Sequence, residues 1–167
     1  DLYQLVNCYM EYGLGIIESN TEYLKGIYDL FQPSINDIKF SKSPFYIYSL
    51  LQIWLMKSQN APSDYVNIFL KCAIDKLSHL INLQNIMKAE QYNYCAYLAF
   101  IYISLIHYSQ IVSTVLAQNN KQDEFLFWNN KLLQMEVTCS YQFKCIILAI
   151  SHLINSGLFD TNINFFI

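Results

Sequence analysis

The side chains best suited to bind a metal ion or to act as nucleophiles are spread thinly along this sequence. Cys145 and His152 are seven residues apart, so they would share one face of a helix, and Cys139 precedes them closely. A structural zinc site needs four ligands with tight local spacing, and only these two or three candidates converge. His79 and His107 fall in other parts of the sequence, away from Cys145 and His152. We therefore predict packed thiols and a hydrogen-bonded histidine, and no metal site.

Acidic side chains form two further groups. Asp123 and Glu124 stand at a predicted helix start, where negative charge complements the exposed N–H groups and the helix dipole. A second group could line a surface that binds a basic cargo segment, or could form a solvated helix face; its members are Glu11, Glu18, Glu22 and Asp29. No HExxH, GxGxxG, P-loop or GxSxG arrangement occurs. We predict no catalytic residue, no cofactor and no enzyme activity.

The composition favours helices over strands. The chain has 167 residues, of which 54% are hydrophobic and 14% are charged, with only four glycines and three prolines. A protein built from tight β-turns would need more of both residue types, so the predicted class is all-α. The net charge is −3, and its lysines are mostly single. Since a phosphate-binding surface needs clustered basic residues, we predict no nucleic-acid binding; Lys39 and Lys42 solvate a predicted loop.

The cysteines indicate a reducing compartment. Their number is odd, no CxxC pair or glycosylation sequon occurs, and they lie within apolar helical stretches, at Cys8, Cys72, Cys95, Cys139 and Cys145. We predict reduced, buried thiols in a cytosolic or nuclear protein. The chain does not open with methionine or a signal peptide, and its last residues are strongly apolar. The expectation is therefore a fragment of a longer polypeptide.

One stretch raises the question of a membrane. Residues 91–120 carry no formal charge, and residues 94–116 would be long enough to span a bilayer. Several polar side chains interrupt this stretch, however, and residues 106–110 resemble a turn between two shorter helices. No lysine-rich flank fixes an orientation. We predict no membrane insertion, although a membrane-bound helical subunit stays open as an alternative.

The apolar periodicity predicts four antiparallel helix pairs of about 40 residues each. The predicted helices are residues 2–13 with 20–34, 43–59 with 62–84, 89–106 with 109–117, and 122–138 with 141–156. Pro44 and Pro62 mark helix starts, and Gly157 marks the last helix end. This period is typical of HEAT-type repeats, so residues 1–167 are predicted to form one α-solenoid segment. A bundle of eight unequal helices is the alternative architecture.

Several of these helices also resemble those of a known family. The matching residues are 23–28 (Tyr-Leu-Lys-Gly-Ile-Tyr), the pair at 49–81, residues 92–118, and 125–155, which includes Phe125 and Trp128 followed by Lys144, Leu148 and Ile150. They resemble the C-terminal HEAT repeats of the importin-β family (karyopherins), closest to the importin-seven/importin-eight branch. The resemblance lies in helix-pair residues and includes no catalytic signature.

This resemblance implies a nuclear transport receptor that shuttles between cytoplasm and nucleus. Such a receptor wraps protein cargo in the concave face of a superhelix, and Ran-GTP releases the cargo from importins. The Ran-binding repeats would lie nearer the N-terminus of the family, outside this segment. Apolar slots between outer helices would receive Phe-Gly repeats of the nuclear pore. The alternative function is a helical-repeat scaffold or adaptor subunit of a large assembly unrelated to transport.

Overall fold

The computed structural model describes residues 2–36, 43–58, 61–83, 86–121, 124–135 and 139–155. These residues form helices and connecting turns, with no strand among them, so the all-α prediction is confirmed. The helices are α1 (Leu2–Tyr12), α2 (Leu14–Glu18), α3 (Thr21–Asn36), α4 (Ser43–Lys57), α5 (Ser63–Ile81), α6 (Lys88–Gln118), α7 (Glu124–Leu133) and α8 (Ser140–Asn155).

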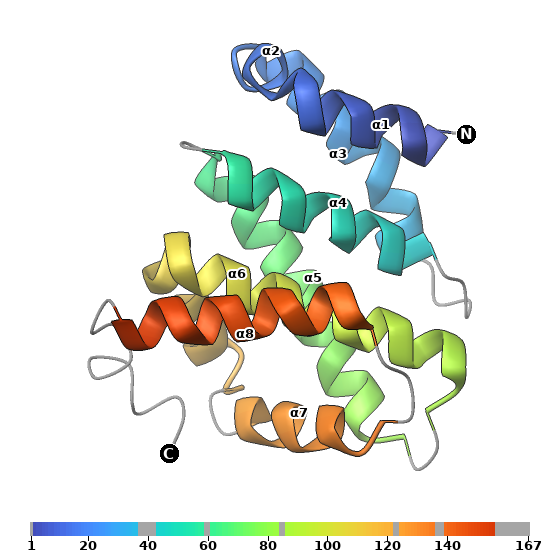
Figure 1. The fold of residues 1–167 in the computed structure, drawn as a ribbon, viewed down its shortest axis with the longest axis vertical. Helices are drawn as coiled ribbons and strands as arrows, with labels where there is room; N and C mark the ends of the chain where they lie inside the picture. Colours follow the sequence, from blue (N-terminus) through green and yellow to red (C-terminus); the bar gives the residue numbers. More distant parts are fainter. Residues whose placement is uncertain are drawn as a thin grey trace.

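The helices are arranged in two rows (Figure 1). In the first row α1 contacts α4, α4 contacts α6, and α6 contacts α8; in the second row α3 contacts α5, and α5 contacts α7. All four helices of the first row run in the same direction across the view, whereas α7 runs the opposite way (Figure 1). The chain therefore alternates between the rows as it passes from one end of the molecule to the other.

The centre of the molecule is α6, which contacts α4, α5, α7 and α8. Residues 93–105 are buried on every side of this helix, which explains why its sequence is apolar all round. By length and composition the segment Glu90–Gln118 would also be able to cross a membrane, but about two thirds (67%) of its most apolar window is buried inside the protein. Coverage by four neighbouring helices accounts for its apolar character.

A break between two helical segments lies within residues 106–110, as predicted, because Tyr108 has non-helical backbone angles (φ −136°, ψ 38°). The two segments meet there in a kink within α6 and are not joined by a separate loop. Just after the kink, Ser113 and Thr114 donate to the carbonyl oxygens of Ser109 and Gln110 at 2.8 and 2.7 Å. In the described part of the chain, α1, α4 and α6 of the first row are each followed by a helix of the second row (α3, α5 and α7), and α8 returns to the first row.

Other boundaries differ less. The short helix α2 lies where a turn between residues 13 and 20 was predicted, and α3 continues past Pro33. Helix α7 ends at Leu133, earlier than predicted. The predictions for Lys39, Lys42, Asp123 and Gly157, and for the apolar last residues, fall outside the described residues.

The two ends of α6 are closed by local hydrogen bonds. At its start the backbone N–H of Met87 donates to the Glu90 carboxylate at 2.9 Å. At its end Asn120 has φ 53°, and the N–H of Lys121 donates to the carbonyl oxygen of Leu116 at 2.8 Å. This is the left-handed geometry of a helix C-cap, in which asparagine replaces the usual glycine.

Buried amide side chains link neighbouring helices of the first row. Gln52 Nε2 donates to the carbonyl oxygen of Ala96 at 2.8 Å, joining α4 to α6. Gln142 Nε2 on α8 donates to Ser49 Oγ on α4 at 3.0 Å. This bond joins two helices that both pack on α6, so α4 and α8 meet beside α6.

Candidate protein-interaction surfaces

The structure separates the residues considered for a metal site. Cys139 lies beside Cys95, Cys145 lies beside Tyr141, and His152 lies beside His107. Across the described ranges, no three His, Cys, Asp or Glu side chains are placed to hold a metal ion. Partial burial and the neighbouring His152 lower the pKa of His107, while His79 is exposed.

The five thiols are free, and three of them are buried. Cys95 and Cys139 share a hydrogen bond. This bond and burial raise the pKa of Cys95. The same bond lowers the pKa of Cys139. Burial also raises the pKa of Cys145. The prediction of buried thiols is wrong for Cys8, which is exposed on α1.

The acidic group predicted on one surface is divided by the fold. Glu11, Glu22 and Asp29 are exposed. Glu18 instead accepts hydrogen bonds from the indole N–H of Trp54, at 3.1 Å, and from the hydroxyl of Ser58, so it joins α2 to α4. Three of the four residues are therefore exposed to solvent, and the fourth stabilises the contact between two helices.

Glu124 lies at a helix start, as predicted, and its hydrogen-bond partners are side chains of neighbouring segments. It lies in the first turn of α7 and accepts bonds from Ser78 Oγ at 2.7 Å and from Lys121 Nζ at 2.6 Å. Burial would raise the pKa of Glu124, but the two donors outweigh that effect and lower it. The carboxylate thus fixes α7 to α5 and to the end of α6.

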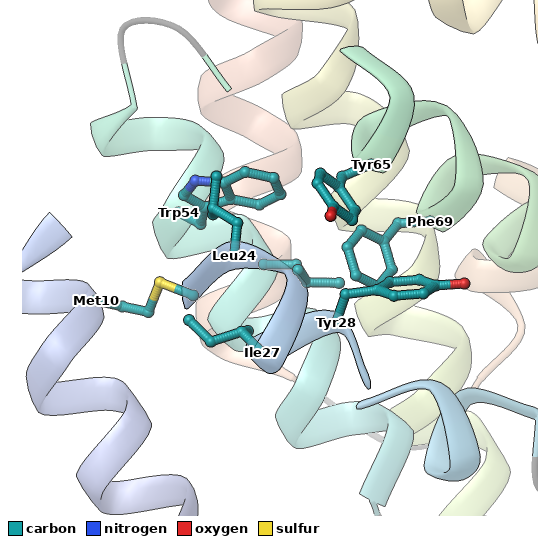
Figure 2. Close-up of a pocket in the computed structure, with 8 residues that line it drawn as sticks. Met10, Leu24, Ile27, Tyr28, Trp54, Tyr65 and Phe69 are labelled. Atoms are coloured by element: carbon teal, nitrogen blue, oxygen red, sulfur yellow. The ribbon is translucent and has the colours of Figure 1, made fainter. Parts of the chain in front are cut away.

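A cavity between α1, α3, α4 and α5 is too small for a ligand (Figure 2). Its volume is about 10 Å³, close to the space that one water molecule requires. It is lined by Met10, Leu24, Ile27, Tyr28, Leu51, Trp54, Tyr65 and Phe69. Because these side chains are mainly apolar, the cavity is a packing void between helices and lacks the polar groups that orient a substrate.

Many of the aromatic side chains belong to the core, as predicted. Tyr48, Tyr94, Phe100, Phe125 and Trp128 are fully buried. Several of the buried tyrosines donate hydrogen bonds: Tyr94 to the carbonyl oxygen of Trp128 at 2.8 Å, and Tyr48 to that of Phe69 at 3.0 Å. Packing between helices therefore accounts for much of the aromatic content.

The exposed apolar side chains include a group at each end of the first row. On α1 they are Leu5, Tyr9 and Tyr12, which we call the α1 face; Tyr12 is 86% exposed. On α8 they form two stripes, Tyr141 with Leu148 and Ile147 with Ile154, on either side of Lys144, and together we call them the α8 face. Exposed apolar side chains gathered on one helix side are typical of protein-interaction surfaces. The α1 face was not predicted from the sequence, although its residues have the i, i+4, i+7 spacing of one helix side.

The chain matches no protein-family model, no curated protein and no solved structure. The resemblance to karyopherins therefore stays a prediction from the sequence.

Proposed function

We propose that this chain is a segment of an α-solenoid that binds other proteins and performs no chemistry itself. The observation that carries the proposal is the pair of exposed apolar faces, one on α1 and one on α8, at opposite ends of a row of stacked helices. A terminal helix with an apolar outer side requires a neighbour, because solenoids that end in solvent present polar capping helices.

Two further observations support a solenoid. Helices of each row contact the next helix of the same row, and the chain alternates between rows. Both features are expected where each repeat packs on its neighbours.

The sequence resemblance gives this proposal a particular form. In that form the chain belongs to a nuclear transport receptor that carries protein cargo through the pore, contacts Phe-Gly repeats, and responds to Ran-GTP through repeats outside this segment. The other form is a scaffold or adaptor subunit of a large assembly unrelated to transport. Both forms use the same non-catalytic surface, and they differ in the response to Ran.

The two forms are separated by binding experiments on the complete polypeptide that contains these residues. It is loaded with proteins from a nuclear extract and exposed to Ran in the GTP or GDP form. GTP-selective binding that releases the captured proteins supports an importin, whereas GTP-selective binding that retains them indicates an exportin. If neither Ran-GTP nor Ran-GDP binds the polypeptide or releases the captured proteins, the transport form is contradicted and the scaffold form is favoured.

A further inference from the structure

Two of the five thiols meet where α8 begins. Cys95 lies in the segment of α6 that is buried on every side, and Cys139 directly precedes α8. The two side chains share a hydrogen bond. Cys95 is fully buried, whereas Cys139 is 5% exposed. Because α8 packs on α6, this contact between two thiols belongs to the interface of the two helices.

The position of Cys139 makes it the more reactive thiol of the pair. Its carbonyl oxygen accepts the backbone N–H of Phe143 at 2.9 Å, so Cys139 stands at the N-terminal end of α8. The partial positive charge of a helix N-terminus favours a thiolate, and the hydrogen bond from Cys95 also lowers the pKa of Cys139. The same bond and burial raise the pKa of Cys95. A thiol that readily ionises therefore lies beside one that stays protonated.

We propose that Cys95 and Cys139 are a redox-active pair that hydrogen peroxide converts to an intramolecular disulfide. The Cys139 thiolate attacks one peroxide oxygen and becomes a sulfenic acid; the O–O bond breaks, and the departing hydroxide takes up the proton that Cys139 lost on ionising. The Cys95 sulfur then attacks the Cys139 sulfur, so that an S–S bond forms, the S–O bond breaks, and water leaves with the Cys95 proton. Two thiols are oxidised, and one peroxide is reduced to two water molecules.

The disulfide would tie the start of α8 to α6. It would close a loop of about 45 residues that contains α7 and most of α6. A cross-link of this kind restricts the unfolded chain and so favours the folded state. Cys145, also on α8, is hydrogen-bonded to Tyr141 instead, and Cys8 is exposed on α1, so neither shares the contact.

The test uses the 167-residue chain with Cys8→Ser, which removes the exposed thiol that could join two molecules. The reduced, folded protein is treated with a small excess of hydrogen peroxide. We expect the intact mass to fall by two hydrogen atoms and a non-reduced digest to contain the Cys95 and Cys139 peptides joined together. The melting temperature should rise by on the order of 10 °C, because the closed loop lowers the entropy of the unfolded chain. Dithiothreitol should reverse both changes.

Three variants in this background separate the roles of the two thiols. Cys95→Ala keeps the reactive thiol without its partner, so Cys139 should form a sulfenic acid that dimedone traps, with no disulfide. Cys139→Ala should leave Cys95 reduced, because that thiol is fully buried and stays protonated. The matched control is Cys145→Ala, which removes another buried thiol of α8 and should form the disulfide as the parent does. Far-UV circular dichroism verifies that the variants keep their helices.

The digest of the Cys8→Ser protein decides the outcome even if a variant does not fold. A protein that keeps all its thiols, or that gains oxygen atoms without a joined Cys95–Cys139 peptide, overturns the proposal. So does a joined peptide that forms equally well in urea, since the folded contact would then not be its cause. None of these results bears on the proposed binding function, which depends on the apolar faces and on Ran.

Discussion

Replacing Gln52 with methionine should stabilise the protein, although Gln52 is fully buried and hydrogen-bonded. Its Nε2 donates to the carbonyl oxygen of Ala96, but its Oε1 is buried with no hydrogen-bond partner in the described part of the chain. The substitution forfeits a hydrogen bond with a net contribution of about 1 kcal/mol and removes an unsatisfied acceptor that costs about 1–3 kcal/mol. Because Ala96 lies within α6, its carbonyl oxygen keeps its helical partner.

The expected result is an unfolding free energy raised by between about zero and 2 kcal/mol. Urea unfolding followed by far-UV circular dichroism measures it. With a slope of about 2 kcal/mol per molar urea, a gain of 1 kcal/mol moves the midpoint up by about 0.5 M and leaves the slope unchanged. Methionine approximates the volume and flexibility of glutamine, so packing strain contributes little.

Gln142 provides the matched control. It is equally buried and donates to Ser49, but its oxygen is not an unpaired buried atom. Gln142→Met therefore loses a bond without relieving a cost and should destabilise the protein by about 1 kcal/mol. The reasoning is refuted if Gln52→Met lowers the unfolding free energy by more than about 1 kcal/mol, as the control does. That result would mean that Gln52 Oε1 has a partner.

Three further predictions follow from the helix ends and buried contacts. Asn120→Ala places a Cβ-bearing residue without a polar side chain at φ 53°, so thermal unfolding should show a loss of about 1 kcal/mol, whereas Asn120→Gly should change little; equal losses would contradict the assigned C-cap. Glu18→Ala leaves the buried indole N–H of Trp54 without its acceptor and should cost about 1–2 kcal/mol in urea unfolding, and less in a Trp54→Phe background. Burial, partly offset by the bond to Asn129, raises the pKa of Tyr102 to about 12, above the value of about 10 for an unfolded tyrosine. The stability that comes from keeping Tyr102 protonated is therefore complete below pH ~10 and lost as pH rises towards 12. The unfolding free energy of Tyr102→Phe should fall less than that of the wild type over that interval. Parallel pH profiles of the two proteins would exclude this contribution.

Local signals predicted helices where they were strong. Pro44 and Pro62 predicted the starts of α4 and α5 within a residue or two, because proline suits the first helical turn. Polar residues indicated the break near Tyr108, where the backbone is non-helical. They did not indicate its form: no glycine or proline lies there, and the two segments meet in a kink without a loop. The short helix α2 was hidden between Gly13 and Asn20, where turn residues dominate the pattern.

The interaction surface was less predictable than the helices. Tyr12 and Met10 are both large and apolar, yet Met10 is buried and Tyr12 is largely exposed. Which side of α1 is covered depends on where α4 packs, and periodicity alone does not specify that. The bond between Glu18 and Trp54 joins residues 36 positions apart, so no local pattern indicates it. Such contacts arise from the tertiary arrangement.

The central position of α6 has a consequence for how the protein opens. Because α6 contacts α4, α5, α7 and α8, these helices should unfold together as one cooperative unit, and amide protons of residues 93–105 should exchange with solvent only on global unfolding. Helix α1 meets the first row mainly through α4, and its buried side chains include Val6 and Met10. Its amides should exchange through smaller, more frequent openings. A docked neighbour on the α1 face would suppress those openings, so hydrogen exchange in α1 would report occupancy of that face while exchange in α6 stayed constant.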